Sequence, residues 1–497
     1  MDKRGAGILL HISSLPSRFG IGDLGPQAYK FADFLYNSGM RFWQILPLNP
    51  TDICHDNSPY KSVSAFAFNP NLISPVHLVE HGLLEKKDIM DIPRRKGSEI
   101  DYHSVVVYKE TLLNKAYENF LKKPNDSHFE QFCTENSYWL DDYALFSALK
   151  SKFSNQIWNK WPVPIRDRYP EEIKRQTGLL QQEIKKKKFF QYLFIIQWEK
   201  LKNYCSNCNI QIIGDIPIYI GMDSVDVWTH SSIFKLDKDK QPLYIAGVPP
   251  DYFSETGQLW GNPVYRWDVM KKNKYQWWIE RLRHNLALFD IVRIDHFRGL
   301  VAYWQVASEE ETAIKGEWIE APADDFLNTI INKFEKLPII AEDLGVITPD
   351  VLNIMKKYNL PGMKVLQFGF RNSVGENEHA VHNVVHNCFL FTGTHDNNTV
   401  QGWYRHDIGK QEKQNINKYV GHKVTKRTVH KELIRLAMIS VANTVIIPIQ
   451  DFLGLGRKAR MNRPFSNKGN WHWKLKPGKL TKKLSRSIKE LIEIYGR

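Results

Sequence analysis

The sequence predicts a (β/α)8 barrel that is enlarged by insertions. Eight short runs rich in β-branched and aromatic residues follow one another along the chain, and segments with helical spacing separate several of them. Alternating strands and helices indicate a parallel sheet covered by helices, and eight such units favour closure into a barrel. A barrel of this kind takes about 250 residues. Because the chain has 497 residues, we expect large insertions.

The expected strands are short apolar runs, most of which lead to an acidic residue. They occupy residues 7–11, 42–46, 210–215, 289–295, 338–342, 363–368, 389–392 and 445–451. The spacing of apolar residues predicts helices over 275–289, 324–333 and 431–441. Thr348 and Pro349 are typical of an N-cap and a first helical position, so a further helix is expected to begin there.

The connections between the early strands are long enough to hold extra structure. We expect an inserted, mainly helical subdomain over about residues 69–209, because Trp139, Tyr143 and Phe146 recur there at helical spacing. Residues 246–263 are rich in Gly, Pro and aromatic residues. They form either a surface loop packed by its own side chains or a lid over a substrate. We favour the lid, because this connection leaves the strand-end side of the barrel.

Composition is that of an ordinary globular protein, with 42% hydrophobic and 25% charged residues, which excludes a wholly disordered chain. No apolar run reaches roughly 18 residues, so we expect no membrane span and no membrane partner. The formal net charge of +14 favours acidic partners. Much of it lies in residues 185–188 and in a basic C-terminal tail, 474–497, where a solvated helix face is the commoner explanation. We therefore expect no nucleic-acid partner.

The cysteines and the known cofactor motifs point away from redox and nucleotide chemistry. Five cysteines in 497 residues are an odd and sparse set, which favours a reducing compartment. Cys205 and Cys208 form a single CxxC, which we interpret as two ordinary thiols. The sequence has no HExxH, no phosphate-binding glycine loop and no converging set of His and Cys, so no metal and no cofactor is expected.

Five acidic residues lie at or just beyond the ends of expected strands: Asp215, Asp295, Glu342, Asp396 and Asp451. The carboxyl ends of barrel strands meet at one mouth. Any one of these acids alone could cap a helix or pair with an arginine. Several together would repel one another, and such a costly cluster favours a functional site. Cleavage of a glycosidic bond needs one ionised carboxylate and one protonated carboxyl.

The spacing around two of these acids predicts their roles. Arg293 precedes Asp295 by two residues and so shares its strand face, where its charge should keep Asp295 ionised as a nucleophile. Glu342 has no basic residue in its own strand. Because Asp295 and Asp396 are expected nearby, the pKa of Glu342 should rise, which suits a general acid.

Polar residues adjoin the candidate acids. Asp396 lies between His395 and two asparagines, a run suited to holding sugar hydroxyls. His296 and His395 each follow or precede a candidate catalytic aspartate. For both histidines, a sugar contact and a core histidine bonded to the backbone stay open as alternatives.

At these motifs the chain resembles the 4-α-glucanotransferases of glycoside hydrolase family 77, also called amylomaltases or disproportionating enzymes. The resemblance covers about residues 4–473 in chain order, and the ordered series is highly specific. The matching stretches are RGAGILLHISSLPS (4–17), GIGDLG (20–25), FWQILPLNPT (42–51), SPYKSVSAFAFNP (58–70), IIGDIPIYI (212–220), GVPPDYFSETGQLWGNP (247–263), VRIDHFRG (292–299), AEDLG (341–345), MKVLQFGF (363–370), GTHDNNT (393–399) and RMNRPFSNKGNW (460–471).

The resemblance implies a barrel of the α-amylase type with inserted subdomains, cytoplasmic and without a metal. It implies that Asp295 is the nucleophile, Glu342 the acid/base and Asp396 the transition-state stabiliser. The resemblance also implies substrate contacts. These are Arg293, His296 and His395 at the donor sugar, Tyr252 and Phe253 on the loop over the acceptor side, and Asp215, Tyr60, Trp260 and Asn462 at further substrate-contact positions. The implied partners are α-1,4-glucans, namely maltooligosaccharides or chains of glycogen or starch.

The activity implied is transfer of α-1,4-glucan segments to the 4-hydroxyl of another glucan or of glucose, by a retaining double displacement. An α-1,4-glucan hydrolase with the same carboxylates is the nearest alternative, and a non-catalytic glucan-binding protein is the second. The chain differs from the family at residues 52–56, where a Gly-Tyr-Gly-Asp-like turn is usual, and at Arg371-Asn372, where an acidic residue is common. The sequence carries no prediction of the oligomeric state.

Overall fold

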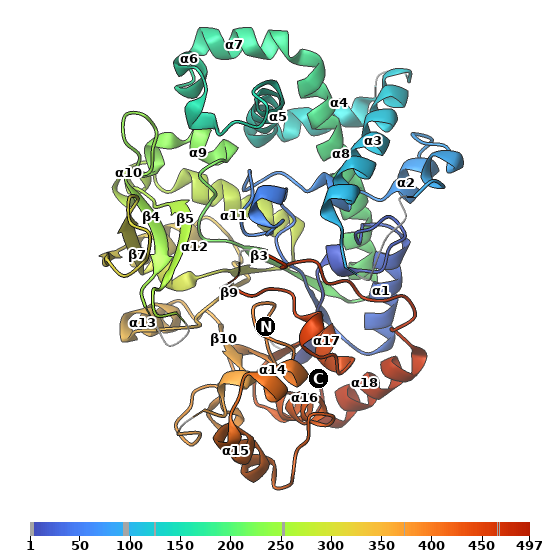
Figure 1. Cartoon of the computed structure of the whole chain (residues 1–497), viewed down its shortest axis with the longest axis vertical. Helices are drawn as coiled ribbons and strands as arrows, with labels where there is room; N and C mark the ends of the chain where they lie inside the picture. The colour runs from blue at the N-terminus through green and yellow to red at the C-terminus, as the bar shows by residue number, and fades with distance from the viewer. Residues whose placement is uncertain are drawn as a thin grey trace.

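A parallel barrel forms the centre of the molecule (Figure 1). The computed structural model describes residues 4–92, 99–123, 126–250, 254–371, 373–464, 466 and 468–497. Eight strands pair in the order β10-β11-β12-β1-β2-β3-β6-β9. The Ala341 amide donates to the Pro361 carbonyl at 2.9 Å, which joins the two ends of the sheet. The strands are β1 (Gly5–Leu9), β2 (Phe42–Gln44), β3 (Gln211–Ile216), β6 (Ile291–Ile294), β9 (Ile339–Ala341), β10 (Gly362–Val365), β11 (Cys388–Phe391) and β12 (Thr444–Pro448).

Each of the eight expected runs overlaps one of these strands, so the predicted barrel is confirmed. Alternate strand residues fill its interior with a hydrophobic cluster that includes Leu9, Ile213, Ile291 and Phe391. The interior is therefore a packed core, as in other barrels of this kind. On β3 and β6 the same alternation carries the chain from apolar residues below to charged residues at the mouth.

The helices predicted from apolar spacing are present within a few residues of their expected ends. They are α11 (Gln276–Leu288), α12 (Ala323–Ile331) and α16 (Val429–Ile439). Thr348 and Pro349 begin α13 (Pro349–Lys357), but the Thr348 side chain makes no capping bond. Its hydroxyl instead accepts from Arg298 at 2.8 Å, so a tertiary contact replaces the local one. The remaining helices that cover the barrel are α1 (Pro26–Asn37), α9 (Val225–Thr229), α10 (Trp267–Lys272), α14 (Val400–His406), α15 (Lys410–Val420) and α17 (Ile449–Phe452).

The connection between β2 and β3 consists of helices, which lie at the top of Figure 1. Trp139, Tyr143 and Phe146 are buried on one of these helices, where they belong to the core. The division of the chain at residues 69–209 stays a prediction. The helices are α2 (Pro75–Glu80), α3 (Tyr102–Leu121), α4 (Ser127–Glu135), α5 (Ser137–Lys152), α6 (Val163–Arg166), α7 (Pro170–Leu179) and α8 (Gln181–Asn207).

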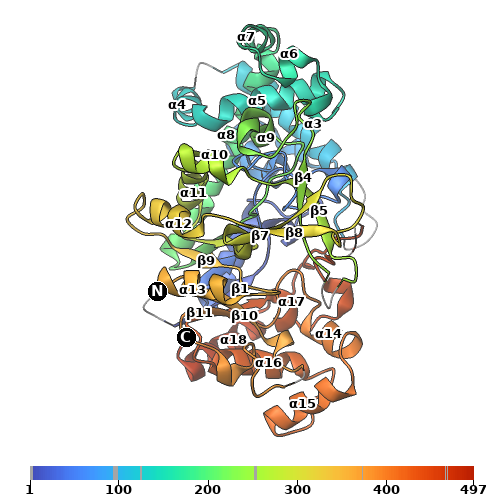
Figure 2. The same ribbon diagram turned by 90° about the vertical axis from the view of Figure 1, so that its left-hand side faces the viewer.

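A second, antiparallel sheet lies beside the barrel and was not predicted (Figure 2). Its order is β5-β4-β7-β8, with β4 (Tyr244–Val248), β5 (Gln258–Pro263), β7 (Ala302–Ala307) and β8 (Gly316–Glu320). Residues 246–248 and 258–263, which belong to the segment expected as a loop, thus lie on the two paired strands of a hairpin. Gly247 and Gly257 interrupt the run of residues that would have predicted a strand. Glycine is needed at Gly247 because the paired backbone comes close: a Cβ there would lie 2.3 Å from the Gln258 carbonyl oxygen.

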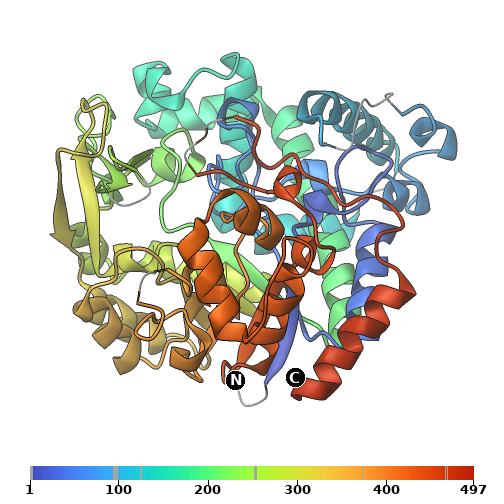
Figure 3. The ribbon, with the colours of Figure 1, turned by 60° about the horizontal axis from the view of Figure 1, so that its bottom comes forward.

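The basic tail ends in a helix that packs on the barrel (Figure 3). Helix α18 (Lys482–Tyr495) buries Ile488 and Ile492 and contacts α1 and α16. After it, the buried Arg497 guanidinium donates to the carbonyls of Met438 and Ser440, both at 2.8 Å. Part of the positive charge of the tail is therefore structural. None of the helices among the described residues has the length and apolar character needed to cross a bilayer.

Candidate active site

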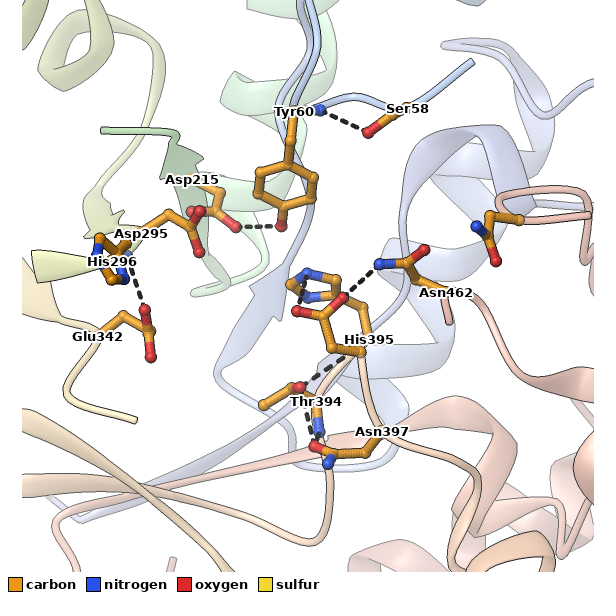
Figure 4. Close-up of polar contacts among 12 residues, drawn as sticks. Ser58, Tyr60, Asp215, Asp295, His296, Glu342, Thr394, His395, Asn397 and Asn462 are labelled. Carbon is orange, nitrogen blue, oxygen red and sulfur yellow. Dashed lines mark hydrogen bonds and ion pairs between the residues drawn. The ribbon is translucent and has the colours of Figure 1, made fainter. Parts of the chain in front are cut away.

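The structure brings four of the five strand-end acids to one mouth of the barrel. Figure 4 shows Asp215, Asp295 and Glu342 there, together with Asn462, which contacts the fourth acid. Asp215 lies on β3, and Asp295 follows β6 directly. Glu342 follows β9, and Asp396 lies on the loop after β11. Their side chains come from strands that are far apart in sequence but adjacent or opposite in the barrel.

Arg293 is the centre of the buried side of this mouth. Its Nη1 donates to both carboxylate oxygens of Asp215 at 2.8 Å, and its Nη2 lies 2.8 Å from Asp295 Oδ1. The Tyr60 hydroxyl also donates to Asp215, at 2.7 Å. The Asp215 side chain is fully buried, so this paired arginine offsets the cost of its charge. Arg293 therefore contacts Asp295 as the two-residue spacing predicts, and its second link to Asp215 fixes its position.

Glu342 has the electrostatic surroundings of a general acid. One of its oxygens accepts the His296 amide at 2.7 Å and the other accepts the Leu344 amide at 2.8 Å. Burial raises its pKa to about 8, and although Arg293, 4.0 Å away, and these two amides oppose the rise, the nearby Asp295 adds to it. The expected direction of the pKa shift is thus present, but burial is its largest cause rather than the neighbouring acids. At neutral pH most Glu342 side chains carry a proton.

Asp396 has different surroundings, because 43% of its side chain is exposed. The Asn462 side-chain amide donates to Asp396 Oδ1 at 2.6 Å. His395 stacks on the Tyr60 ring with 5.1 Å between the ring centroids and 14° between the planes. Tyr60 thus contacts Asp215 through its hydroxyl and His395 through its ring, and joins the two sides of the mouth.

His296 and Trp260 form a further wall near Glu342. His296 adopts a left-handed backbone conformation with φ of 50°, which turns its amide toward Glu342. Burial lowers the pKa of its imidazole to about 4, so the ring is neutral. Its Nε2 finds no hydrogen-bond partner among the described residues. The Trp260 ring meets the imidazole edge-on at 4.8 Å, which brings the β4–β5 hairpin to the mouth.

Asp451, the fifth acid of the expected cluster, does not belong to this site. Its carboxylate accepts the Thr392 hydroxyl at 2.7 Å and the Val400 amide at 2.8 Å. It is buried, and burial raises its pKa to about 6. Asp451 therefore joins the loop after β11 to the start of α14. The expected cluster of five acids is wrong in this one member, because a strand-end acid can also serve a backbone amide.

The polar run after His395 is partly used to hold its own loop. Asn397 Oδ1 accepts both the amide and the hydroxyl of Thr394, at 2.8 and 2.9 Å. Asn398 donates to Asp407 at 3.0 Å. The side chains of Asn397 and Asn398 therefore stabilise the loop that carries Asp396. Two further predicted contacts, Tyr252 and Phe253, lie outside the described residues.

Two residues near the mouth were missed by reasoning from the sequence. Arg460 donates to the Asp396 carbonyl at 2.7 Å. The Trp471 ring lies 5.8 Å from that of Tyr60 and 6.0 Å from that of His395. Both belong to the stretch RMNRPFSNKGNW, which was quoted for the resemblance but carries no catalytic signature of its own. The described residues contain no group of three or more His, Cys, Asp or Glu suited to a metal ion.

Comparisons with known proteins agree on one family. The profile of glycoside hydrolase family 77, described as 4-alpha-glucanotransferase, matches residues 10–481. A 4-alpha-glucanotransferase from Aquifex aeolicus is 45% identical over 492 residues, which are 99% of each chain. One from Clostridium butyricum is also 45% identical, over 98% of this chain and 100% of its own. An amylomaltase from Streptococcus agalactiae, solved with acarbose, superposes with a TM-score of 0.96 at 38% identity over 100% of both chains.

Proposed function

Since the chain belongs to the 4-alpha-glucanotransferases of glycoside hydrolase family 77, we propose that Asp295, Glu342 and Asp396 carry its reaction. As a 4-α-glucanotransferase, the protein moves α-1,4-glucan segments to the 4-hydroxyl of another glucan or of glucose. The reaction is a double displacement that retains the configuration at the anomeric carbon. The roles of the individual residues are our proposal.

In the first step, an oxygen of Asp295 attacks the anomeric carbon of the donor sugar. The bond from that carbon to the bridging oxygen breaks, and Glu342 gives its proton to this oxygen as the first product leaves. Arg293 orients the attacking carboxylate and balances its charge, since its Nη2 lies 2.8 Å from Asp295 Oδ1. The high pKa of Glu342 ensures that the proton is available at neutral pH.

In the second step, Glu342 is ionised and acts as the base. It takes the proton of an incoming 4-hydroxyl, whose oxygen attacks the anomeric carbon and displaces Asp295. Two inversions restore the α-linkage, and Glu342 regains its proton. Transfer exceeds hydrolysis when a sugar is positioned better than water, and Trp260 at the edge of His296 supplies an aromatic wall for such an acceptor.

Asp396 and the residues around it contact the donor sugar, whose ring is distorted as the glycosidic bond breaks. A carboxylate fixed by Asn462 stabilises the positive charge that develops as the glycosidic bond breaks. The stacked pair of Tyr60 and His395 offers a flat wall for the same ring. The neutral His296 and the buried Asp215 with Arg293 complete the proposed donor contacts.

The observation that carries this proposal is the difference between two carboxyl groups that share one arginine. Asp295 is paired with Arg293 at 2.8 Å, whereas Glu342 lies 4.0 Å from it and has a pKa of about 8. Incubation with maltotriose tests the function: the enzyme produces glucose and chains longer than the substrate, whereas a hydrolase produces only shorter ones. Glu342→Gln should lose transfer with maltotriose, and full activity of this variant would refute its role as acid/base.

The substrates proposed in finer detail are maltooligosaccharides and the linear α-1,4 chains of glycogen or starch. The flat apolar faces of the glucose units in such chains suit the aromatic rings that border the mouth. The Streptococcus agalactiae relative was solved with acarbose, and we expect acarbose to compete with maltotriose here. We further propose a cytoplasmic location, on the grounds of five sparse cysteines that are all free thiols.

A further inference from the structure

The chain after α17 crosses in front of the barrel before it reaches α18 (Figure 1). We call its described residues 460–464 and 468–473 the strap. The Trp471 amide donates to the Met461 carbonyl at 2.8 Å, so the two halves of the strap lie together. Both residues join the hydrophobic cluster inside the barrel, at its mouth. Through Asn462, the strap also contacts the carboxylate of Asp396.

A series of hydrogen bonds runs along the strap from its far side to Asp396. Asp56 Oδ2 accepts the Asn470 amide at 2.8 Å. The Asn470 side-chain oxygen accepts the Arg463 amide at 2.9 Å. Arg463 is the neighbour of Asn462, whose side chain donates to Asp396 at 2.6 Å. Three hydrogen bonds thus connect Asp56 with a proposed catalytic carboxylate.

The strap also has supports other than the hydrogen bond between Asp56 and Asn470. His472 Nε2 lies 3.5 Å from Asp56 Oδ1, and the same residue donates through Nδ1 to the Ile100 carbonyl at 2.7 Å and accepts the Ile100 amide at 2.8 Å through its own carbonyl. The Tyr102 hydroxyl donates to the Trp471 carbonyl at 3.0 Å. Arg460 donates to the carbonyls of Asn462 and Asp396, at 2.6 and 2.7 Å. With these supports, loss of one hydrogen bond at Asp56 should displace the strap locally without unfolding it.

The positions of Asp56 and Asn470 suit a role in orienting the strap. Asp56 ends the short helix Ile53–His55 in a left-handed conformation with φ of 53°, which turns its carboxylate to the strap. Asn470 is only 4% exposed, so its side-chain bonds are shielded from competing water.

We infer that Asp56 and Asn470 are positioning residues for Asp396, which act through Asn462. They hold the strap in the register that places the Asn462 amide on the Asp396 carboxylate. The inference rests on the proposed role of Asp396 in the transfer reaction. The Asp396 side chain is 43% exposed, and the Asn462 amide on Oδ1 is shorter, at 2.6 Å, than the 3.5 Å approach of His395 Nε2 to Oδ2.

The first experiment compares Asp56→Ala with Asp56→Asn and Asp52→Ala. In Asp56→Ala, kcat for maltotriose disproportionation should fall about 10-fold with KM within about twofold, because the loss is in transition-state positioning. Asp56→Asn keeps an oxygen for the Asn470 amide and should restore kcat to within about threefold of wild type. Asp52 accepts the Cys54 amide on the same short helix and has no contact with the strap in the part of the chain described. Its alanine variant should keep wild-type kcat.

The second experiment separates positioning from a general structural role. Asn462→Ala should lower kcat about 100-fold, and Asp56→Ala should then add less than about twofold, because its route to Asp396 is already broken. Asn470→Ala should behave like Asp56→Ala in both backgrounds. Multiplicative losses in the double variants, or wild-type kcat in Asp56→Ala, would overturn the inference.

Asp396→Ala distinguishes the failure of this inference from the failure of the proposed function. If Asp396→Ala keeps wild-type kcat, the proposed role of Asp396 is wrong and the inference is wrong with it. If Asp396→Ala is inactive while Asp56→Ala and Asn470→Ala are unchanged, only the positioning role is wrong. The expected pattern is an inactive Asp396→Ala and partial, non-additive losses at Asp56 and Asn470.

Discussion

The two sides of the barrel mouth hold their carboxylates in different ways. On one side Asp215, Arg293, Asp295 and Glu342 lie on strand ends, and their side chains are between 0 and 27% exposed. On the other side Asp396 lies on a loop, with 43% of its side chain exposed, and hydrogen bonds from the strap hold it. The strand-end side controls the protonation of Glu342. On the loop side, contacts from the strap control the position of Asp396, so substitutions on the two sides should have different signatures.

The largest loss of activity is expected when the proposed nucleophile on the strand-end side is replaced. Asp295→Asn removes the nucleophile and should lower kcat with maltotriose by about 10⁴-fold or more. Asp295 is 27% exposed and paired with one arginine, so the variant should still fold and bind glucan. Product analysis by chromatography and maltotriose binding by calorimetry measure the two properties. A rate of transfer within tenfold of wild type would show that Asp295 is not the nucleophile.

The second largest effect is expected at Arg293, where a substitution should lower both the activity and the stability of the protein. Arg293→Met leaves the fully buried Asp215 without its cation, and removal of one partner of a buried pair costs about 3–5 kcal/mol in the free energy of unfolding. The variant should also raise the pKa of Glu342, since Arg293 opposes the effect of burial there. Denaturant unfolding and the pH profile of kcat/KM test both parts. A matched control is Asn462→Ala on the loop side, which should lower kcat without a comparable loss of stability.

Much of the strand-end side was predictable from the sequence. On the loop side the acid was predicted as well, but the contacts that hold it were not. Arg293 and Asp295 are two residues apart, and the alternation of a strand brings them together. Asp56 and the Asn470 amide are 414 residues apart in sequence, and no local pattern predicts such a pair. The antiparallel sheet was missed because Gly and Pro dominate its first hairpin. The pKa of Glu342 was predicted in direction, but its main cause is burial, which depends on tertiary packing.

The third prediction concerns pH and sharpens the contrast between the two sides. The first step needs protonated Glu342 in the free enzyme, so kcat/KM for maltotriose should fall as pH rises above about 8, by tenfold per pH unit at the limit. Substitution of Asn462 on the loop side should lower the whole profile without moving this limb. A limb at pH 5 or below would mean that Glu342 is ionised in the free enzyme.

The smallest effect also concerns the Glu342 carboxyl group and is a change in the free energy of unfolding with pH. The pKa of Glu342 rises from 4.5 to about 8 on folding. Between these values the unfolded chain is ionised while the folded one keeps its proton, so the folded state loses stability as pH rises, and the loss levels off above about 8. In Glu342→Gln this dependence is absent. Stability of the wild type relative to Glu342→Gln should therefore fall by about 1.4 kcal/mol per pH unit, or about 3 kcal/mol from pH 5 to pH 7.

This comparison does not depend on how well glutamine fits the site. Both oxygens of Glu342 accept backbone amides, and a glutamine can offer only one acceptor, so Glu342→Gln carries a constant penalty. A constant penalty shifts the difference in stability at every pH but leaves its slope unchanged. Denaturant unfolding at pH 5, 6 and 7 measures the slope. A difference in stability that stays constant from pH 5 to pH 7 would mean that folding does not raise the pKa of Glu342, and the buried side of the mouth would then lack the electrostatic character that sets it apart.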